Sequence, residues 1–390
     1  MSDYLQCSAC SKKLSSFHSY SCPQCWGPVV YVRDGSKIEH EQHDGIWRYA
    51  DRLPAAVDPL PYWPVGNTPL LAAPSLAELW NVDQVWVKNE TANPTHSFKD
   101  RVVSVAIARA RKLGLQTVAC TSTGNLGHAL AAAAAQAGLR CIVLVPSSVE
   151  PAKTSAAAAL GAKVIRLQGS YDDVNRVAHQ LADEVNWGWV NMTLRPFYAE
   201  GSKTLIWEVL DQLDTPPSDI VCPIASGSLY SKLVSGAGQA GVEGIRFHGA
   251  QAAGCAPVAK AYDDAEQHVQ PVKPDSRAHS LAIGNPADGD TALKAAAASE
   301  GEIVAVPESS LPQGVSILGA ASGLLTESAG AVTTLGADQL AAAGKFNQAS
   351  RIVLVITGDG LKGMDLVEDS VLLSESLPTC ADTVLEFVGS

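Results

Sequence analysis

A lysine stands at a position where a free cation would be poorly placed. Lys99 lies in the string Asn93-Pro-Thr-His-Ser-Phe-Lys-Asp-Arg101, which follows a short apolar strand pattern and opens a segment of helical periodicity. The dipole of a helix disfavours positive charge near its first turn. A lysine amine can instead form a covalent Schiff base with a carbonyl compound. The pattern makes Lys99 a candidate for covalent chemistry, although a solvated surface lysine explains the isolated residue equally well.

Four of the nine cysteines lie near the N-terminus in two Cys-x-x-Cys pairs. The pairs are Cys7-Ser-Ala-Cys10 and Cys22-Pro-Gln-Cys25, and 11 residues separate them. Two such turns facing each other offer four thiolates in a tetrahedral arrangement, which suits zinc and closes its coordination sphere. The spacing predicts a structural, non-catalytic zinc site, with accidental clustering or a redox dithiol as alternatives.

Two turns rich in small residues suit the binding of anions. Ser122-Thr-Gly-Asn-Leu-Gly127 and Pro223-Ile-Ala-Ser-Gly-Ser-Leu229 each lie between a strand pattern and a helix pattern. The first amides of a helix have no partner within it, so they can donate to a phosphate or a carboxylate. An ordinary capping turn is the alternative for each. Thr357 ends a very apolar strand pattern, where its hydroxyl could bond a ring nitrogen or cap a turn.

Cations in two further segments could hold a phosphate group. Arg176 ends the segment Gly169-Ser-Tyr-Asp-Asp-Val-Asn-Arg176, and two more cations lie in Leu194-Arg-Pro-Phe-Tyr-Ala-Glu-Gly-Ser-Lys203. A guanidinium is well suited to a dianionic phosphate, because it donates parallel hydrogen bonds. Each of these cations, taken alone, is more often a solvated surface charge.

These motifs fall between alternating strand and helix patterns. Short apolar runs predict strands at residues 85–88, 117–120, 140–145, 163–167, 219–224, 245–250 and 351–356. Apolar spacing and glycine stops predict helices at residues 99–113, 125–136, 151–160 and 174–185. Such alternation is typical of parallel α/β sheets, which bind ligands at the carboxyl ends of their strands. The sequence predicts a small cysteine knob followed by two α/β units.

Length and charge narrow the function classes. A chain of 390 residues with 46% hydrophobic residues predicts more than one domain with a substantial core. The net charge of −12 disfavours a nucleic-acid partner, and the knob adds few basic residues (Lys12 and Lys13). No apolar run reaches the length of a membrane span, and the N-terminus lacks the pattern of a signal peptide. We therefore expect a cytoplasmic protein without a membrane partner.

The string around Lys99 resembles the cofactor-lysine motif of the threonine synthases. These are pyridoxal-phosphate enzymes of fold type II, the tryptophan synthase β-like class. The resemblance runs from Val65-Gly-Asn-Thr-Pro-Leu70 to Thr357-Gly-Asp-Gly-Leu-Lys362. It implies two three-layer α/β domains with the cofactor in the interdomain cleft. The two cysteine pairs predict an N-terminal zinc ribbon in addition. The implied boundaries are residues 1–36 for the zinc ribbon, 37–100 with 205–390 for the large domain, and 101–204 for a smaller mobile domain.

The resemblance also implies roles for individual residues. Lys99 would carry pyridoxal 5'-phosphate and act as the catalytic base, Asn125 would bond the cofactor's ring oxygen, and Thr357 its ring nitrogen. The residues implied for the cofactor phosphate are Ser226, Gly227, Ser228 and Leu229. The residues implied for the substrate are Ser122, Thr123, Ser170, Arg176 and Arg195. Family analogy adds homodimer formation.

The implied reaction is a β,γ-replacement on O-phospho-L-homoserine, a phosphorylated amino acid, that yields L-threonine and phosphate. Lys99 would remove the Cα proton, phosphate held by Arg176 would leave from Cγ, and water would add at Cβ. Two positions depart from the family pattern: Ser170 stands where asparagine is usual, and Ser322 where glutamate is usual. They keep open a related pyridoxal-phosphate enzyme acting on phosphoserine or another hydroxy amino acid, such as a cysteate synthase or a dehydratase. A non-catalytic zinc-ribbon binding protein is the alternative of another class.

Overall fold

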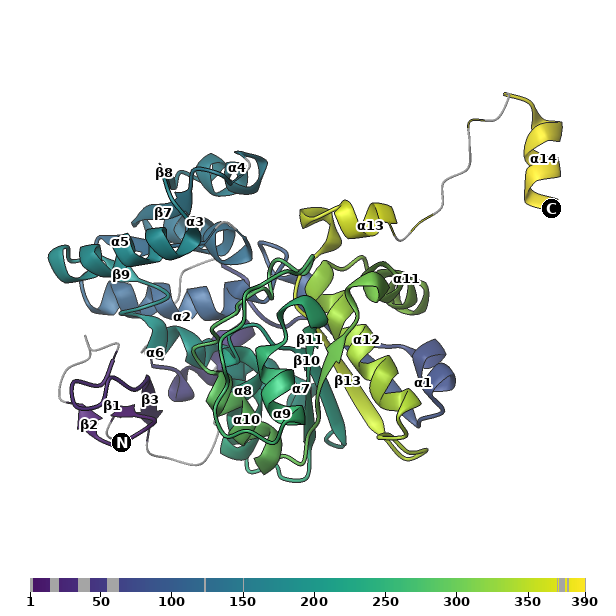
Figure 1. Cartoon of the computed structure of the whole chain (residues 1–390), viewed down its shortest axis with the longest axis horizontal. Helices are drawn as coiled ribbons and strands as arrows, with labels where there is room; N and C mark the ends of the chain where they lie inside the picture. Colours follow the sequence, from purple (N-terminus) through teal and green to yellow (C-terminus); the bar gives the residue numbers. More distant parts are fainter. Residues whose placement is uncertain are drawn as a thin grey trace.

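Three β-sheets organise the chain in a computed structural model (Figure 1). The structure describes residues 3–14, 21–33, 43–54, 63–122, 124–149, 151–369, 371, 376 and 379–389. The strand orders are β2-β1-β3, β12-β11-β10-β13-β5-β4 and β8-β7-β6-β9. The predicted α/β class is confirmed, because two of these sheets are mainly or wholly parallel and are flanked by helices.

The six-stranded sheet is parallel except at one edge. Its strands are β4 (Leu70–Ala72), β5 (Gln84–Asn89), β10 (Asp219–Pro223), β11 (Arg246–Ala252), β12 (Ile303–Val306) and β13 (Arg351–Ile356). Only β4 pairs antiparallel, with β5. The apolar run of β13 is buried on both faces, as expected for a central parallel strand. Val353 and Val355 join one core, while Ile352, Leu354 and Ile356 join the other.

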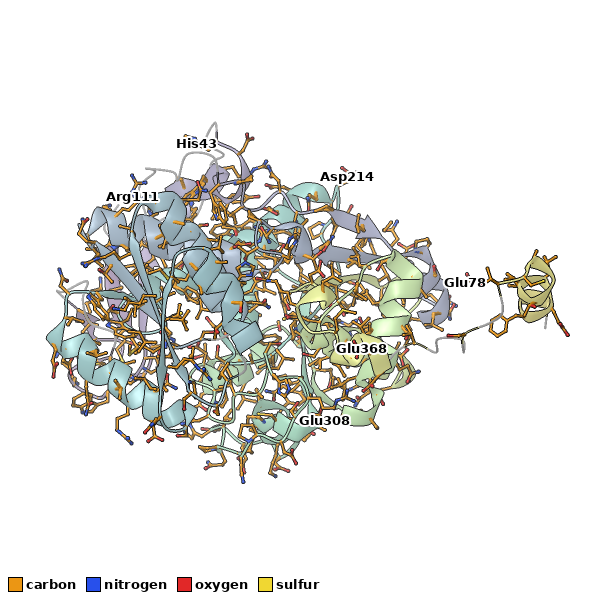
Figure 2. The ribbon with its side chains drawn as sticks, turned by 90° about the horizontal axis from the view of Figure 1, so that it is seen from above. His43, Glu78, Arg111, Asp214, Glu308 and Glu368 are labelled. Atoms are coloured by element: carbon orange, nitrogen blue, oxygen red, sulfur yellow. The ribbon has the colours of Figure 1, made fainter. Side chains whose placement is uncertain are left out.

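Helices cover both faces of this sheet. Around the first core lie α7 (Lys203–Gln212), α8 (Ser228–Gln239), α9 (Pro257–Asp263) and α10 (Gly289–Ala298). Around the second lie α1 (Pro74–Trp80), α11 (Leu311–Ser322) and α12 (Ser328–Ala342). The remaining C-terminal helices are α13 (Asp365–Asp369) and α14 (Ala381–Gly389). Charged side chains such as Glu78, Arg111 and Asp214 lie at the periphery of the molecule (Figure 2).

The four-stranded sheet is wholly parallel. It contains β6 (Thr117–Cys120), β7 (Arg140–Pro146), β8 (Lys163–Leu167) and β9 (Gly188–Trp189). Its helices are α2 (Lys99–Lys112), α3 (Asn125–Ala137), α4 (Pro151–Ala159), α5 (Tyr171–Glu184) and α6 (Arg195–Tyr198). Most alanines of α3 are buried and let this helix pack closely against α2.

The helix boundary that differs most from the sequence prediction is the start of α5. The helix expected to start at residue 174 begins at Tyr171. Ser170 caps it: its Oγ accepts from the backbone N–H of Asp173, whose carboxylate in turn accepts from the backbone N–H of Ser170. Such a reciprocal box satisfies amides that the first turn leaves free, so the helix starts earlier than its apolar spacing indicates.

The small antiparallel sheet forms the knob. Its strands are β1 (Asp3–Cys7), β2 (Lys13–Leu14) and β3 (Val29–Arg33). Leu5, Val29 and Tyr31 join the core of the four-stranded sheet, and the Tyr31 ring lies 6.0 Å from that of Phe197 on α6. Short 3₁₀ segments complete the chain: η1 (Gly45–Arg52), η2 (Glu90–Ala92), η3 (Ala199–Ser202), η4 (Ala253–Cys255), η5 (Glu308–Ser310) and η6 (Gly360–Lys362). Among the described helices, none has the length and apolarity that a membrane crossing needs.

Candidate active site

Lys99 is the first residue of α2 and is half-buried. Its Nζ lies 3.4 Å from the hydroxyl of Tyr198, at the end of α6. The backbone N–H of Phe98 donates to the carbonyl of Thr357 at 2.9 Å, and Ser97 forms a β-bridge with Gly358. The start of α2 is thereby tied to the carboxyl end of β13, so Lys99 and Thr357 come from distant segments to one place.

The turn before Lys99 is held by its own side chains. Asp100 accepts hydrogen bonds from the backbone N–H and the hydroxyl of Thr95, at 2.7 and 2.8 Å. Burial raises the pKa of Asp100 to about 6, although the Thr95 hydrogen bonds oppose the rise. The conformation of the turn therefore depends on residues of the motif itself.

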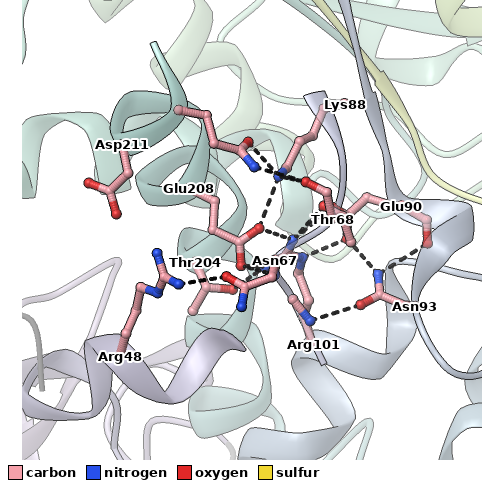
Figure 3. A network of polar contacts seen from close by, with 12 residues as sticks. Arg48, Asn67, Thr68, Lys88, Glu90, Asn93, Arg101, Thr204, Glu208 and Asp211 are labelled. Atoms are coloured by element: carbon pink, nitrogen blue, oxygen red, sulfur yellow. Dashed lines mark hydrogen bonds and ion pairs between the residues drawn. The ribbon is translucent and has the colours of Figure 1, made fainter. Parts of the chain in front are cut away.

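A buried ionic network anchors Arg101, the last residue of the motif (Figure 3). The Arg101 guanidinium bonds both oxygens of Glu90 and both oxygens of Glu208, at 2.6 to 2.8 Å. Lys88 adds a second cation, with its Nζ 2.9 Å from Glu208. Two cations thus face two carboxylates, all almost fully buried. This network connects α2, β5 and α7, and so fixes the helix that begins with Lys99.

Asn125 opens α3 and lies in a polar chain that sequence reasoning missed. Its Nδ2 donates to both carboxylate oxygens of Glu327 at 3.0 Å, and its Oδ1 accepts from Lys362 Nζ at 2.9 Å. Burial raises the pKa of Glu327, against the Asn125 hydrogen bond and the charges of Lys362 and Lys99. A Cβ on Gly358 would lie 2.3 Å from a Glu327 oxygen, so this glycine leaves the room that the carboxylate occupies.

Ser322, where the family resemblance leads to the expectation of a glutamate, makes other contacts in the structure. Ser322 lies at the end of α11, where its hydroxyl donates to the carbonyl of Leu318. Glu327, five residues later, brings a carboxylate to Asn125. Ser322 therefore ends a helix, and the carboxylate that contacts Asn125 is that of Glu327.

The turn at residues 226–229 connects β10 to α8. Gly227 has a φ of 90°, and a Cβ there would lie 2.5 Å from the carbonyl oxygen of Asp288. Glycine is required because both the conformation and the space exclude a side chain. The turn places the hydroxyls of Ser226 and Ser228 at the N-terminus of a 12-residue helix. Its amides and hydroxyls suit the phosphate of a cofactor. Since β10 pairs with β13, it lies beside the strand that Thr357 directly follows.

The residues predicted for the substrate are spread over several elements. Ser122 follows β6, and Thr123 lies outside the described residues. Ser170 caps α5, and Arg176 pairs with Asp173 at 2.8 Å with 68% of its side chain exposed. Neither contacts Lys99 or Asn125 among the hydrogen bonds of the described residues.

Arg195 lies nearer to the turn at residues 226–229. Its guanidinium pairs with Asp288 at 2.5 Å, and the backbone N–H of Asp288 donates to the carbonyl of Ser226. The ion pair connects α6, beside the four-stranded sheet, to the loop that lines this turn. Lys203, in contrast, is buried in an ion pair with Glu200 at 2.6 Å.

The four cysteines of the knob converge. The sulfur atoms of Cys7, Cys10, Cys22 and Cys25 all lie within 4.8 Å of one another. Two of the separations are 3.5 and 3.7 Å. A tetrahedral zinc site with Zn–S bonds of about 2.3 Å needs sulfur atoms roughly 3.8 Å apart. The four-thiol donor set therefore fits zinc in both chemistry and spacing.

Comparison with known proteins identifies a family and several relatives. The family described as "Pyridoxal-phosphate dependent enzyme" matches residues 64–358. A threonine synthase of Methanocaldococcus jannaschii is 33% identical over 363 residues, covering 89% of each chain. That of Methanosarcina acetivorans is 32% identical over 94% of each chain. That of Synechocystis sp. is 35% identical and covers 77% of this chain and 78% of its own.

Solved structures of low sequence identity share the fold. A diaminopropionate ammonia lyase from Escherichia coli has a TM-score of 0.68 at 19% identity, with 78% of this chain and 87% of its own covered. A threonine deaminase from Solanum lycopersicum has a TM-score of 0.66 at 20% identity, with 78% and 88% covered. At these identities the likeness concerns the fold alone.

Proposed function

Since the chain belongs to the family of pyridoxal-phosphate-dependent enzymes, we propose that it is a threonine synthase, which converts O-phospho-L-homoserine and water to L-threonine and phosphate. One observation carries the proposal. The relatives named threonine synthase match this chain at 30–35% identity, and several match it over nearly its whole length. The likeness thus extends beyond the segments that any pyridoxal-phosphate enzyme needs.

The cofactor supplies an aldehyde for a covalent link to lysine and a ring that withdraws electrons from the substrate. Lys99 would form that link. Asn125 would donate to the ring oxygen, and the Thr357 hydroxyl would bond the ring nitrogen without the full charge that an aspartate would bring. The amides and hydroxyls that would hold the phosphate belong to Ser226, Gly227, Ser228 and Leu229. The required glycine and the helix N-terminus at this turn support that assignment.

The Lys99 amine, once released from the cofactor, would move the proton at the substrate's Cα. Tyr198 lies within hydrogen-bonding distance of this amine. Ser122 and Thr123 would bind the substrate carboxylate.

Ser170, Arg176 and Arg195 would bind the substrate phosphate. Arg176 and Arg195 each pair with an aspartate. Each would exchange that carboxylate for the phosphate, which a guanidinium binds with the same fork of donors.

A comparison of substrates tests this function. We expect phosphate release from O-phospho-L-homoserine with a kcat/KM about 10–200-fold above that for O-phosphoserine, because the two differ by one methylene. L-Threonine should give no ammonia. Enzyme assayed without cofactor is the control. Absence of phosphate release from O-phospho-L-homoserine would refute the proposal, and preferred turnover of phosphoserine or threonine would favour the related lyases.

We also propose that the knob binds one structural zinc ion. Zinc analysis of the purified protein should give about one ion per chain, and Cys22→Ala should lower the content to near zero, because three thiolates leave the site open. Cys380→Ala is the matched control, since Cys380 is an exposed cysteine remote in sequence from the knob. Equal zinc content in the two variants would contradict the proposal.

Our proposal for partners concerns one class of small molecule. A phosphorylated amino acid is the small-molecule partner, and the net charge of −12 argues against nucleic acid. A homodimer is proposed from the family resemblance. The cytoplasmic location stays a prediction from the sequence.

A further inference from the structure

We propose that Lys362 is a positioning residue that fixes the orientation of the Asn125 amide, so that its NH₂ group and not its oxygen is available to the cofactor's ring oxygen. The inference rests on the proposed function through the contact of Asn125 with the cofactor. It assigns a task to a lysine outside the motif of Lys99. Lys362 and Asn125 are 237 positions apart in the sequence and meet only in the folded protein.

The geometry places Asn125 between a donor and an acceptor. Lys362 Nζ donates to Asn125 Oδ1 at 2.9 Å. On the other side of the amide, Asn125 Nδ2 donates to the two oxygens of Glu327, each at 3.0 Å. The order is therefore cation, amide oxygen, amide nitrogen, carboxylate.

This order permits one orientation of the amide. A lysine ammonium has donors only, and an ionised carboxylate has acceptors only. A flipped Asn125 would turn its NH₂ group toward Lys362 and its oxygen toward Glu327. Both contacts would then become repulsive. An asparagine without Lys362 would lose the partner that holds its oxygen in place.

The amide retains a donor for a ligand. An asparagine NH₂ group has two N–H bonds, and one is enough for the Glu327 carboxylate. The second can serve the anionic ring oxygen of a bound cofactor. Glu327 thus shares the amide with the ligand, whereas Lys362 determines which end of the amide the ligand meets.

Lys362 is itself held in place. It closes η6, and Asp359 caps this turn by accepting from the backbone N–H of Leu361 at 2.8 Å. Asp359 also forms a β-bridge with Thr326, next to Glu327. Burial lowers the pKa of Lys362, while the charges of Glu327, Asp100 and Asp359 oppose the shift. The segment that follows β13 therefore brings Thr357, Gly358 and Lys362 to one site.

The test titrates pyridoxal 5'-phosphate into cofactor-depleted protein and records the visible absorbance. Lys362→Met should weaken cofactor binding roughly tenfold, as expected for the loss of one charge-assisted hydrogen bond, and alter the absorbance spectrum. Lys362→Arg, which retains a cation, should keep most of the wild-type cofactor affinity and of the wild-type absorbance spectrum. Circular dichroism of each variant verifies the fold.

A double-mutant cycle separates positioning from a direct effect of charge. In an Asn125→Ala background, Lys362→Met should change neither the affinity nor the spectrum. An unchanged affinity and spectrum in Lys362→Met alone, or the same loss in both backgrounds, would overturn the proposal. The titration contains no amino acid, so its outcome is independent of which substrate the enzyme turns over.

Discussion

Lys99→Ala should lower kcat by at least about 10³-fold and remove the covalent component of the cofactor's visible absorbance. Alanine has no amine to link to the cofactor or to move the Cα proton. The side chain is half-buried and begins α2, so its loss should leave the fold intact. The measurements are phosphate release from O-phospho-L-homoserine and an absorbance spectrum of the purified variant.

The matched control is Lys294→Ala, an exposed lysine on α10. It should retain wild-type turnover and spectrum. Addition of a primary amine to Lys99→Ala should recover part of the activity if the missing function is the amine itself. Wild-type turnover in Lys99→Ala would exclude this lysine as the catalytic group.

Several features of the fold could be predicted from the sequence. The strands at residues 117–120 and 163–167 have the predicted bounds, and the helix expected at 125–136 ends one residue later. Apolar runs and glycine stops act locally, so they can be read without the tertiary structure. The convergence of Lys99 and Thr357 follows from the rule that ligand-binding loops lie at the carboxyl ends of strands.

The parts of the site that were missed depend on long-range contacts. Glu327 and Lys362 reach Asn125 from 202 and 237 positions away. Lys362 ends a recognised motif, but the motif does not indicate that this lysine contacts Asn125. Tyr198 reaches Lys99 across 99 positions. A lone tyrosine or lysine in a sequence carries no sign of its partner, so only the structure reveals these contacts.

The motif around Lys99 combines chemistry with structure. Asp100 bonds Thr95 within the motif, and Asn93 donates to the carboxylate of Glu90 at 2.8 Å. Arg101 enters the ionic network with Glu90 and Glu208. Much of the string therefore positions one amine, which explains why the resemblance identifies the cofactor better than it identifies the substrate.

Arg101→Met should lower the free energy of unfolding by about 3–5 kcal/mol, because it leaves buried carboxylates without their main cation. Methionine occupies a similar volume but cannot bond Glu90 or Glu208. Lys88 remains near Glu208, whereas Glu90 loses its ion pair and retains only neutral donors, the hydroxyl of Thr68 and the amide of Asn93. Urea denaturation followed by tryptophan fluorescence measures the change.

The same variant should change the response to acid. Although burial opposes ionisation, Arg101 and Lys88 hold the pKa of Glu208 at about 2, below its ordinary value of 4.5. A depressed carboxyl pKa stabilises the fold above pH 4.5, and this contribution is lost as the pH falls from 4.5 towards about 2. The pKa of Asp100 is instead raised, to about 6, so the ionisation of Asp100 lowers the stability of the fold as the pH rises. This effect is present in both wild type and Arg101→Met.

The difference in the free energy of unfolding between wild type and Arg101→Met therefore measures the contribution of the ionic network. It should be largest near neutral pH and shrink below pH 4.5, as the carboxylates become protonated in both proteins. Lys260→Met is the control, because its ion pair with Asp264 is exposed and should contribute within about 1 kcal/mol. If Arg101→Met cost no more than Lys260→Met, the buried network would not be what holds the start of α2 in place.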